Sequence, residues 1–219
     1  MIDLHTHTFF SDGELIPSEL VRRAIVKGYS AMAITDHADL SNIEMIVPCI
    51  ARVSAELSKR CGIEVIPGVE LTHVPPADIA GLAKEARKLG ARIVLCHGET
   101  IVEPVQPGTN SAALNSEIDI LTHPGLITME EAKLAAERGI YLEITARKGH
   151  SLTNGHVAKI ALAAGAKLIV NTDTHSPGDM ITDEDAERIV VGAGLTTEDF
   201  RRMMNNAEEL VKRLKYERV

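Results

Sequence analysis

The sequence has no tryptophan, and aromatic residues make up only 3% of its 219 residues. It also lacks an excess of positive charge, because 31 acidic and 23 basic residues give a formal net charge of −8. Proteins that bind long nucleic acids combine a basic surface with aromatic side chains on which bases stack. We therefore do not expect a long nucleic acid as a partner.

Long hydrophobic runs are missing as well. No stretch approaches the roughly 18 consecutive apolar residues that a membrane-spanning helix requires. The first residues, MIDLHTHT, have the pattern of a strand and not that of a basic segment followed by an apolar leader. We expect no membrane association and a cytoplasmic protein, and nothing in the pattern indicates an oligomeric state.

Short apolar runs alternate with amphipathic stretches along the chain, which is the pattern of repeated strand–helix units. Strands are expected at 1–5, 31–36, 63–71, 91–97, 118–123, 139–145 and 167–173. Helices are expected at 17–28, 41–61, 77–89, 128–138, 154–165 and 183–192, followed by a pair at 196–204 and 206–216. No linker or repeat interrupts this order, so we expect one α/β domain spanning 1–219.

Six histidines stand where an expected strand ends: His5, His7, His37, His97, His123 and His175. The carboxyl ends of parallel strands face one common crevice or barrel mouth. An open sheet would bring only a few strand ends to its binding site. Because ligand-type residues end every expected strand except the sixth, a closed or nearly closed barrel is favoured.

The first strand ends in a pair of histidines, with an aspartate shortly beyond it. His5 and His7 stand at i and i+2, so both imidazoles point to one side of the strand and can reach one metal ion. Asp12, in the following turn, can add an oxygen ligand to a neighbouring ion. A chance pair on an edge strand is the alternative, but this strand has the pattern of a buried one.

Carboxylates accompany histidines at other strand ends. Asp36 precedes His37 and can orient its imidazole, the alternative being that the two residues simply form a polar strand end. Glu70 is a lone carboxylate in an apolar strand, where an unpaired charge would be costly. A metal ion or a buried arginine would remove that cost. Asp173 and His175 again offer two ligands on one side of a strand.

Nine side chains of metal-ligand type thus stand at six strand ends. They are His5, His7, Asp12, His37, Glu70, His97, His123, Asp173 and His175. This mixture of imidazoles and carboxylates suits Zn²⁺, Mn²⁺ or Fe²⁺, whereas Mg²⁺ and Ca²⁺ prefer oxygen ligands alone. The sequence therefore predicts a multinuclear metal centre and a metal-dependent hydrolase.

Two further features concern the surroundings of this centre. Cys49, Cys61 and Cys96 are odd in number and form no CxxC pair, so neither a disulfide framework nor a zinc ribbon is expected. If His97 faces the mouth, Cys96 faces the helices and packs in the core. Segment 98–109 has no helical period, and we expect it to form a loop over the mouth.

Taken in order, the motifs resemble those of the PHP (polymerase and histidinol phosphatase) family. They are HTH at 5–7, SDG at 11–13, TDH at 35–37, GVE at 68–70, CHG at 96–98, THPG at 122–125 and TDTH at 172–175. The resemblance covers nearly the whole chain. It implies a distorted (β/α)7 barrel that holds three divalent metal ions at the carboxyl ends of the strands.

The resemblance also implies which residues share an ion. The first ion would be held by His5, His7, Glu70 and Asp173, and Glu70 would bridge to a second ion held with His97 and His123. The third ion would be held by Asp12, His37 and His175. Family members carry either histidine or aspartate at the position of Asp12, so all nine expected positions have a competent ligand.

The implied chemistry is the hydrolysis of a phosphate ester. Metal ions polarise the phosphoryl oxygens and generate a hydroxide nucleophile near neutral pH, so His5, His7, Glu70 and Asp173 would act catalytically through a metal-activated water. The expected substrate is a small phosphorylated metabolite, with histidinol phosphate as one candidate. Negative charge on the protein does not oppose this, because bound cations supply local positive charge.

The sixth strand is followed by a basic run. We expect Arg147 to grip a phosphate with two donors and Lys148 and His150 to assist, the alternative being a solvated basic loop. His73, three residues after Glu70, is expected either to contact substrate or to lie on a surface loop.

Three alternatives to a phosphomonoesterase remain open. One is a phosphodiesterase or exonuclease acting on nucleotides or DNA ends. Another is a metal-binding interaction module without turnover. The third is C–N bond hydrolysis of the amidohydrolase type, which typically uses a carbamylated lysine as the bridge where Glu70 stands here.

Overall fold

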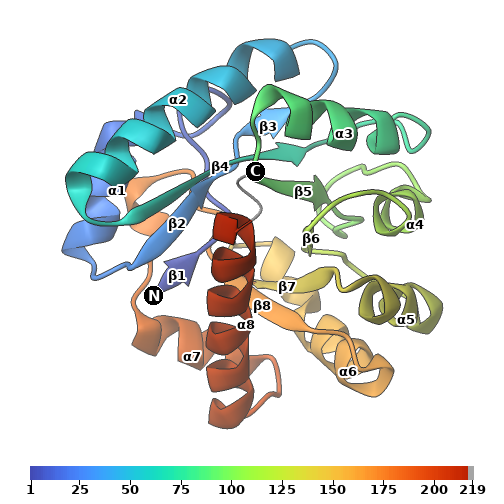
Figure 1. Cartoon of the computed structure of the whole chain (residues 1–219). Coiled ribbons are helices and arrows are strands. Elements are labelled where there is room, and N and C mark those ends of the chain that lie inside the picture. The colour runs from blue at the N-terminus through green and yellow to red at the C-terminus, as the bar shows by residue number, and fades with distance from the viewer. Residues whose placement is uncertain (217–219) are drawn as a thin grey trace.

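Seven parallel strands run around a common axis, with helices outside them, in the computed structural model of the chain (Figure 1). The structure describes residues 1–216, so the last three residues of the expected domain 1–219 lie outside the described residues. The strands are β1 (Ile2–Asp3), β2 (Ala31–Ile34), β3 (His37–Ala38), β4 (Glu64–Leu71), β5 (Ile93–His97), β6 (Ile120–Thr122), β7 (Tyr141–Thr145) and β8 (Leu168–Asn171).

The short strand β3 continues β2. Ala31 pairs with Glu64 and His37 pairs with Glu70, so the offset of 33 residues against β4 is the same in both segments. The barrel therefore has seven strand positions in the order β1-β2-β4-β5-β6-β7-β8, with β3 extending β2. This agrees with the seven strands expected from the sequence.

First and last strands meet beyond the ends of β1 and β8. Thr6 and Thr174 form a parallel bridge, and the backbone N–H of His7 donates to the carbonyl of Thr174 over 2.8 Å. The Leu4 N–H donates to Oδ1 of Asn171 over 2.9 Å. The barrel is thus nearly closed, and the two ends of the sequence that carry the HxH and DxH motifs lie side by side.

The helices agree with most of the expected ranges. They are α1 (Pro17–Val26), α2 (Ile43–Cys61), α3 (Ile79–Leu89), α4 (Thr109–Leu114), α5 (Met129–Arg138), α6 (Asn154–Ala164), α7 (Asp183–Gly192) and α8 (Thr197–Tyr216), with 3-10 turns η1 (His150–Thr153) and η2 (Pro177–Asp179). Helix α5 shows how local sequence sets the helix ends. Thr128 and Glu131 form a capping box at its start, and Gly139 ends it at φ 67°.

The expected pair of C-terminal helices is one helix, α8, and this corrects the prediction. The Asn205–Asn206 junction lowers helix propensity, but the apolar spacing of Met203, Ala207 and Leu210 continues across it. Asn206 also donates from Nδ2 to the Leu168 carbonyl over 2.8 Å, which ties the junction to the barrel.

Side chains alternate between the barrel interior and the helix-facing core. Ile93 and Leu95 point inward, whereas Val94 and Cys96 pack toward the helices, as expected for Cys96. Gly68 faces Ile93, and a Cβ there would lie 2.4 Å from Ile93 Cγ2, so the interior has no room for a larger residue.

Helix α8 closes the amino end of the barrel. Its apolar residues join the interior side chains of the strands in one buried cluster, and Figure 1 shows it crossing this end of the ring. Arg213 Nη2 donates to Asp119 over 2.6 Å, and Arg92 donates to the Leu214 carbonyl, which anchors the end of the helix. None of the helices within residues 1–216 is long and apolar enough to cross a membrane.

A substitution at Leu210 tests whether α8 stabilises the barrel by filling its amino end with apolar side chains. Because the side chain is 1% exposed inside the interior cluster, Leu210→Ala is expected to lower the free energy of unfolding by about 2–5 kcal/mol. Lys212→Ala, on the solvent side of the same helix, is expected to change it by less than about 0.5 kcal/mol. Denaturant titration measures both free energies of unfolding. Equal effects of the two substitutions would contradict the claim that α8 stabilises the barrel by filling its amino end.

Candidate metal centre

All nine side chains that the sequence analysis predicts as metal ligands lie together at the carboxyl end of the barrel. They are supplied by the β1–α1 segment, β3, β4, β5, the ends of β6 and β8 and the adjoining loops. Four sets that could each hold an ion are formed largely by these residues: His7/Asp12/His37/His175, His97/His123/His150, His5/His123/Asp173 and His5/His7/Glu70.

The innermost contacts join imidazoles to two buried carboxylates. His5 Nε2 lies 3.2 Å from Glu70 Oε2, and His7 Nε2 lies 3.2 Å from Asp173 Oδ1. His123 Nε2 lies 3.6 Å from the second oxygen of Glu70, Oε1. Two ligand atoms that are each about 2.1 Å from a tetrahedral ion lie about 3.4 Å apart, so these separations fit shared ions.

Asp12 completes the outer edge of the cluster. Its Oδ1 lies 3.4 Å from His37 Nε2 and 3.2 Å from His175 Nε2. The ring of His175 stacks on that of His7 at 4.2 Å, so this set adjoins the inner one. The arrangement matches the third ligand group that the motifs imply.

Several ligand atoms are buried without a hydrogen bond. Eight buried side-chain nitrogen or oxygen atoms of the described residues have no such partner, and seven of them belong to predicted ligands. They are His5 Nε2, both ring nitrogens of His7 and of His123, Glu70 Oε2 and Asp173 Oδ1. Because unpaired buried polar atoms are rare and costly, their concentration at one place indicates that the residues fit divalent cations.

Other polar groups hold the ligands in place. Glu143, at 0% exposure on β7, accepts from His5 Nδ1 over 2.9 Å and from the His123 N–H over 3.0 Å. Its Oε1 also accepts from Asn171 Nδ2 over 2.9 Å. Glu143 therefore orients the imidazole of His5 and holds the backbone of His123 at the end of β6. None of the sequence motifs predicts this role, although a lone carboxylate in an apolar strand is the same signal that indicated Glu70.

Asp36 has a different role from the expected one. It was expected to orient the imidazole of His37, but its carboxylate accepts from both the N–H and the hydroxyl of Thr8 and of Ser11. It therefore shapes the turn that carries Asp12. The Nδ1 of His37 lies 2.7 Å from Thr72 Oγ1 instead, because the ring points toward β4.

Burial tunes the protonation of the ligands. It holds the pKa of His7 and of His123 well below the usual value, which favours the neutral form that binds metal. At His5, His37 and His97, burial also lowers the pKa, but nearby carboxylates outweigh it and raise the pKa above the usual value. Burial opposes ionisation of Glu70, but the neighbouring His5 and His37 together outweigh it and hold the pKa of Glu70 well below its usual range. Burial also raises the pKa of Asp173 to about 7.

A sequence profile of the PHP domain matches residues 3–150. An uncharacterised protein of Methanocaldococcus jannaschii is 51% identical over 215 residues, which are 97% of this chain and 99% of that protein. This chain belongs to the PHP domain family. The family assignment that the ordered motifs predicted is therefore confirmed.

Further relatives extend the comparison. A protein of Thermoanaerobacter sp. strain X514 named a probable phosphatase is 28% identical over 216 residues, covering 90% of this chain and 87% of that protein. A histidinol phosphate phosphatase of Lactococcus lactis, solved with zinc, L-histidinol and phosphate, has a TM-score of 0.62 at 17% identity, covering 89% of this chain and 94% of that one. A chain of an archaeal ribonuclease P with mature tRNA has a TM-score of 0.73 at 16% identity, covering 99% and 92%. Both structures show the same fold as this PHP barrel.

A cavity of about 230 Å³ opens above the ligands of the PHP barrel. Arg147, His73 and His150, three of the predicted substrate-binding residues, line it. The fourth, Lys148, is exposed and is not among the lining residues. His150 is buried and stacks on His123 at 4.1 Å, which places it against the metal ligands.

Glu103 also lines the cavity, although no sequence motif includes it. It comes from the irregular segment 98–108, which lies over the mouth as expected. Its carboxylate lies 3.1 Å from His97 Nε2 and 3.3 Å from His150 Nε2. No periodic pattern in that segment indicates which of its residues points inward.

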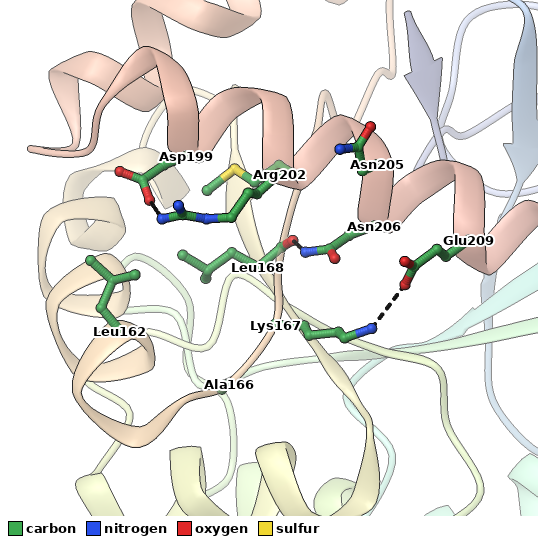
Figure 2. Close-up of a pocket in the computed structure, with 10 residues that line it drawn as sticks. Leu162, Ala166, Lys167, Leu168, Asp199, Arg202, Asn205, Asn206 and Glu209 are labelled. Atoms are coloured by element: carbon green, nitrogen blue, oxygen red, sulfur yellow. Dashed lines mark hydrogen bonds and ion pairs between the residues drawn. The ribbon is translucent and has the colours of Figure 1, made fainter.

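A larger hollow of about 380 Å³ lies between α8 and the start of β8, at the other end of the PHP barrel (Figure 2). Its charged side chains are paired with one another: Lys167 with Glu209 over 2.9 Å, and Arg202 with Asp199. None of the buried atoms without a hydrogen bond belongs to its lining. The lining of this hollow therefore gives no indication of a metal-binding or catalytic site, and we describe it as a surface groove between α8 and the barrel.

Glu143 is expected to be a positioning residue for the metal centre. Glu143→Gln replaces one acceptor oxygen with a donor, so either His5 or the His123 N–H loses its partner, and the affinity for Mn²⁺ or Zn²⁺ is expected to fall about 10–100-fold. Glu137→Gln on the exposed face of α5 is the matched control. Calorimetric metal titration measures both, and equal affinities would rule out the positioning role.

Proposed function

We propose that this chain is a metal-dependent phosphoesterase that hydrolyses a small phosphomonoester. The observation that carries the proposal is the cluster of buried ligand atoms without hydrogen bonds directly beneath a cavity that also contains a guanidinium group. Three divalent ions, Zn²⁺, Mn²⁺ or Fe²⁺, are proposed for the nine ligands. When bound, they supply Lewis-acid polarisation of the phosphoryl group and an activated water.

Arg147 is proposed to bind the phosphate. Its side chain is 30% exposed at the cavity, and its Nη1 lies 3.2 Å from Asp179 Oδ2. The same Asp179 oxygen accepts from the N–H groups of His175 and Ser176, so one carboxylate fixes the arginine relative to the metal ligands. A planar guanidinium held in this way has further donors free for two phosphate oxygens.

The size of the cavity favours a small monoester. Pockets for drug-sized ligands usually span roughly 300–1,000 Å³, and about 230 Å³ is enough only for a phosphate with a compact leaving group. The relative named a probable phosphatase and the Lactococcus enzyme solved with L-histidinol and phosphate support the same class, and histidinol phosphate is one candidate substrate.

A phosphodiesterase acting on nucleotides or nucleic-acid ends is the second candidate. Relatives named 5'-3' exoribonuclease favour it, one from Salmonella typhimurium being 29% identical over 177 residues. The net charge of −8 and the small cavity weigh against a long strand as substrate. A metal-binding module without turnover is the third candidate, and an assay separates all three.

A substrate screen tests the proposed function. Protein loaded with Mn²⁺, Zn²⁺ or Fe²⁺ is expected to release phosphate from at least one compact monoester, histidinol phosphate and mononucleotides being included in the panel. His7→Ala and Glu70→Ala are expected to lose this activity, because each removes buried ligand atoms. Cleavage of dinucleotides without release from any monoester would favour the diesterase. No turnover at full metal occupancy would favour the non-catalytic module.

Arg147→Ala is expected to raise KM for the phosphoester about tenfold to a hundredfold, because it removes charged hydrogen bonds of about 1.5–3 kcal/mol. Lys148→Ala, the exposed neighbour, is the matched control and is expected to leave KM unchanged. Steady-state kinetics on the substrate found in the screen measure both. A KM for Arg147→Ala that equals the control value would remove Arg147 from the phosphate site.

A further inference from the structure

Segment 98–108 crosses the cavity mouth between β5 and α4, and its ends are tied down. Oε1 of Glu99 accepts from the N–H groups of Gly108 and Asn110, each over 2.9 Å, which closes the segment into a loop. The middle reaches the barrel through Thr100, whose hydroxyl lies 2.8 Å from His150 Nδ1, and through Glu103.

Three imidazoles surround the carboxylate of Glu103. Oε2 lies 3.1 Å from His97 Nε2 and 3.3 Å from His73 Nε2, and Oε1 lies 3.3 Å from His150 Nε2. One protonated imidazole would suffice for an ion pair. Nε2 atoms that converge on a carboxylate from separate elements, at separations near 3.4 Å, match ligand atoms around an ion.

The imidazoles are held so that these nitrogens face inward. His97 Nδ1 lies 3.1 Å from the Gly98 carbonyl, and Thr100 holds His150 from the opposite side of its ring, so each keeps Nε2 free. His97, with only one free nitrogen, can bind a single ion. An ion at His97 is therefore the second ion of the proposed centre, which the motifs assign to Glu70, His97 and His123. Residues on the side of segment 98–108 can supply further ligands to it.

The backbone of His73 gives an independent indication. His73, His123 and Asp173 are the three non-glycine residues with positive φ among the described residues, at 52°, 25° and 54°. Side chains other than glycine avoid this region, and such strain concentrates at functional sites. His73 therefore has the same kind of strained backbone as two predicted metal ligands. Its ring stacks on that of His97, with the ring centroids 5.2 Å apart.

We propose that Glu103 and His73 bind a divalent cation together with His97, and that this ion fastens segment 98–108 across the mouth. The ligand atoms of these three residues lie within 4.8 Å of one another. Two imidazoles and one carboxylate form a set that holds catalytic Zn²⁺ or Fe²⁺ and leaves further positions open. This proposal rests on the metal centre of the proposed function and adds two ligands to it. Its tests require no knowledge of the substrate.

Metal titration of the chelator-treated full chain tests the ligands. Wild-type protein and Glu103→Gln are titrated with Mn²⁺ and with Zn²⁺ in a calorimeter, and the variant is expected to bind one ion at least about tenfold more weakly. His73→Ala is expected to weaken the same ion. Glu99→Gln is the matched control, because it removes a carboxylate charge from the same loop and retains an acceptor oxygen for Gly108 and Asn110.

Amide hydrogen exchange tests the fastening. Exchange in residues 99–107 is expected to slow when Mn²⁺ is added to wild-type protein and to Glu99→Gln, but not when it is added to Glu103→Gln. Unchanged affinities in Glu103→Gln, or a metal-independent exchange rate in this segment, would overturn the inference while leaving the phosphoesterase proposal intact. Absence of metal binding in the wild type would overturn both.

Discussion

The buried carboxylates and imidazoles at the carboxyl end of the barrel are the constraint on which the rest of this structure depends. Glu70 is fully buried, and its Oε2 makes no hydrogen bond, although ring nitrogens of His37 and His5 lie 2.9 and 3.2 Å from it. The Nε2 atoms of His5 and His7 make no hydrogen bond either. A protein interior tolerates such groups only when an opposite charge satisfies them. The centre is therefore built for cations, and the surrounding fold serves to hold its ligands in place.

Closure of the barrel makes this centre a single site. The Thr6–Thr174 bridge joins segments that are 168 residues apart in the chain, and it brings the HxH pair against Asp173 and His175. Helix α8 seals the opposite end with apolar side chains, so the polar residues of the interior collect at the mouth. Glu143 then fixes the His5 imidazole and the His123 backbone, and Asp36 fixes the turn that carries Asp12, each through several hydrogen bonds.

Local rules explain how much of this could be predicted from the sequence. Apolar runs that end in histidine indicate both the strands and the proposed ligands, because the carboxyl ends of the strands meet at the mouth of this fold. Glu143 could have been identified by the argument used for Glu70. Glu103 could not, because it lies in an aperiodic segment whose path depends on contacts such as that of Glu99 with Gly108. The continuity of α8 depends on packing against the barrel, which outweighs the weak helix propensity of Asn205 and Asn206.

Anomalous X-ray diffraction from crystals grown with Mn²⁺ or Zn²⁺ tests the central claim most directly. The account predicts anomalous peaks between the imidazoles of His5 and His7 and the carboxylates of Glu70 and Asp173, with further peaks beside His97 and Asp12. Crystals grown with excess metal that show no peak within reach of these atoms, and water bound to them instead, would contradict it.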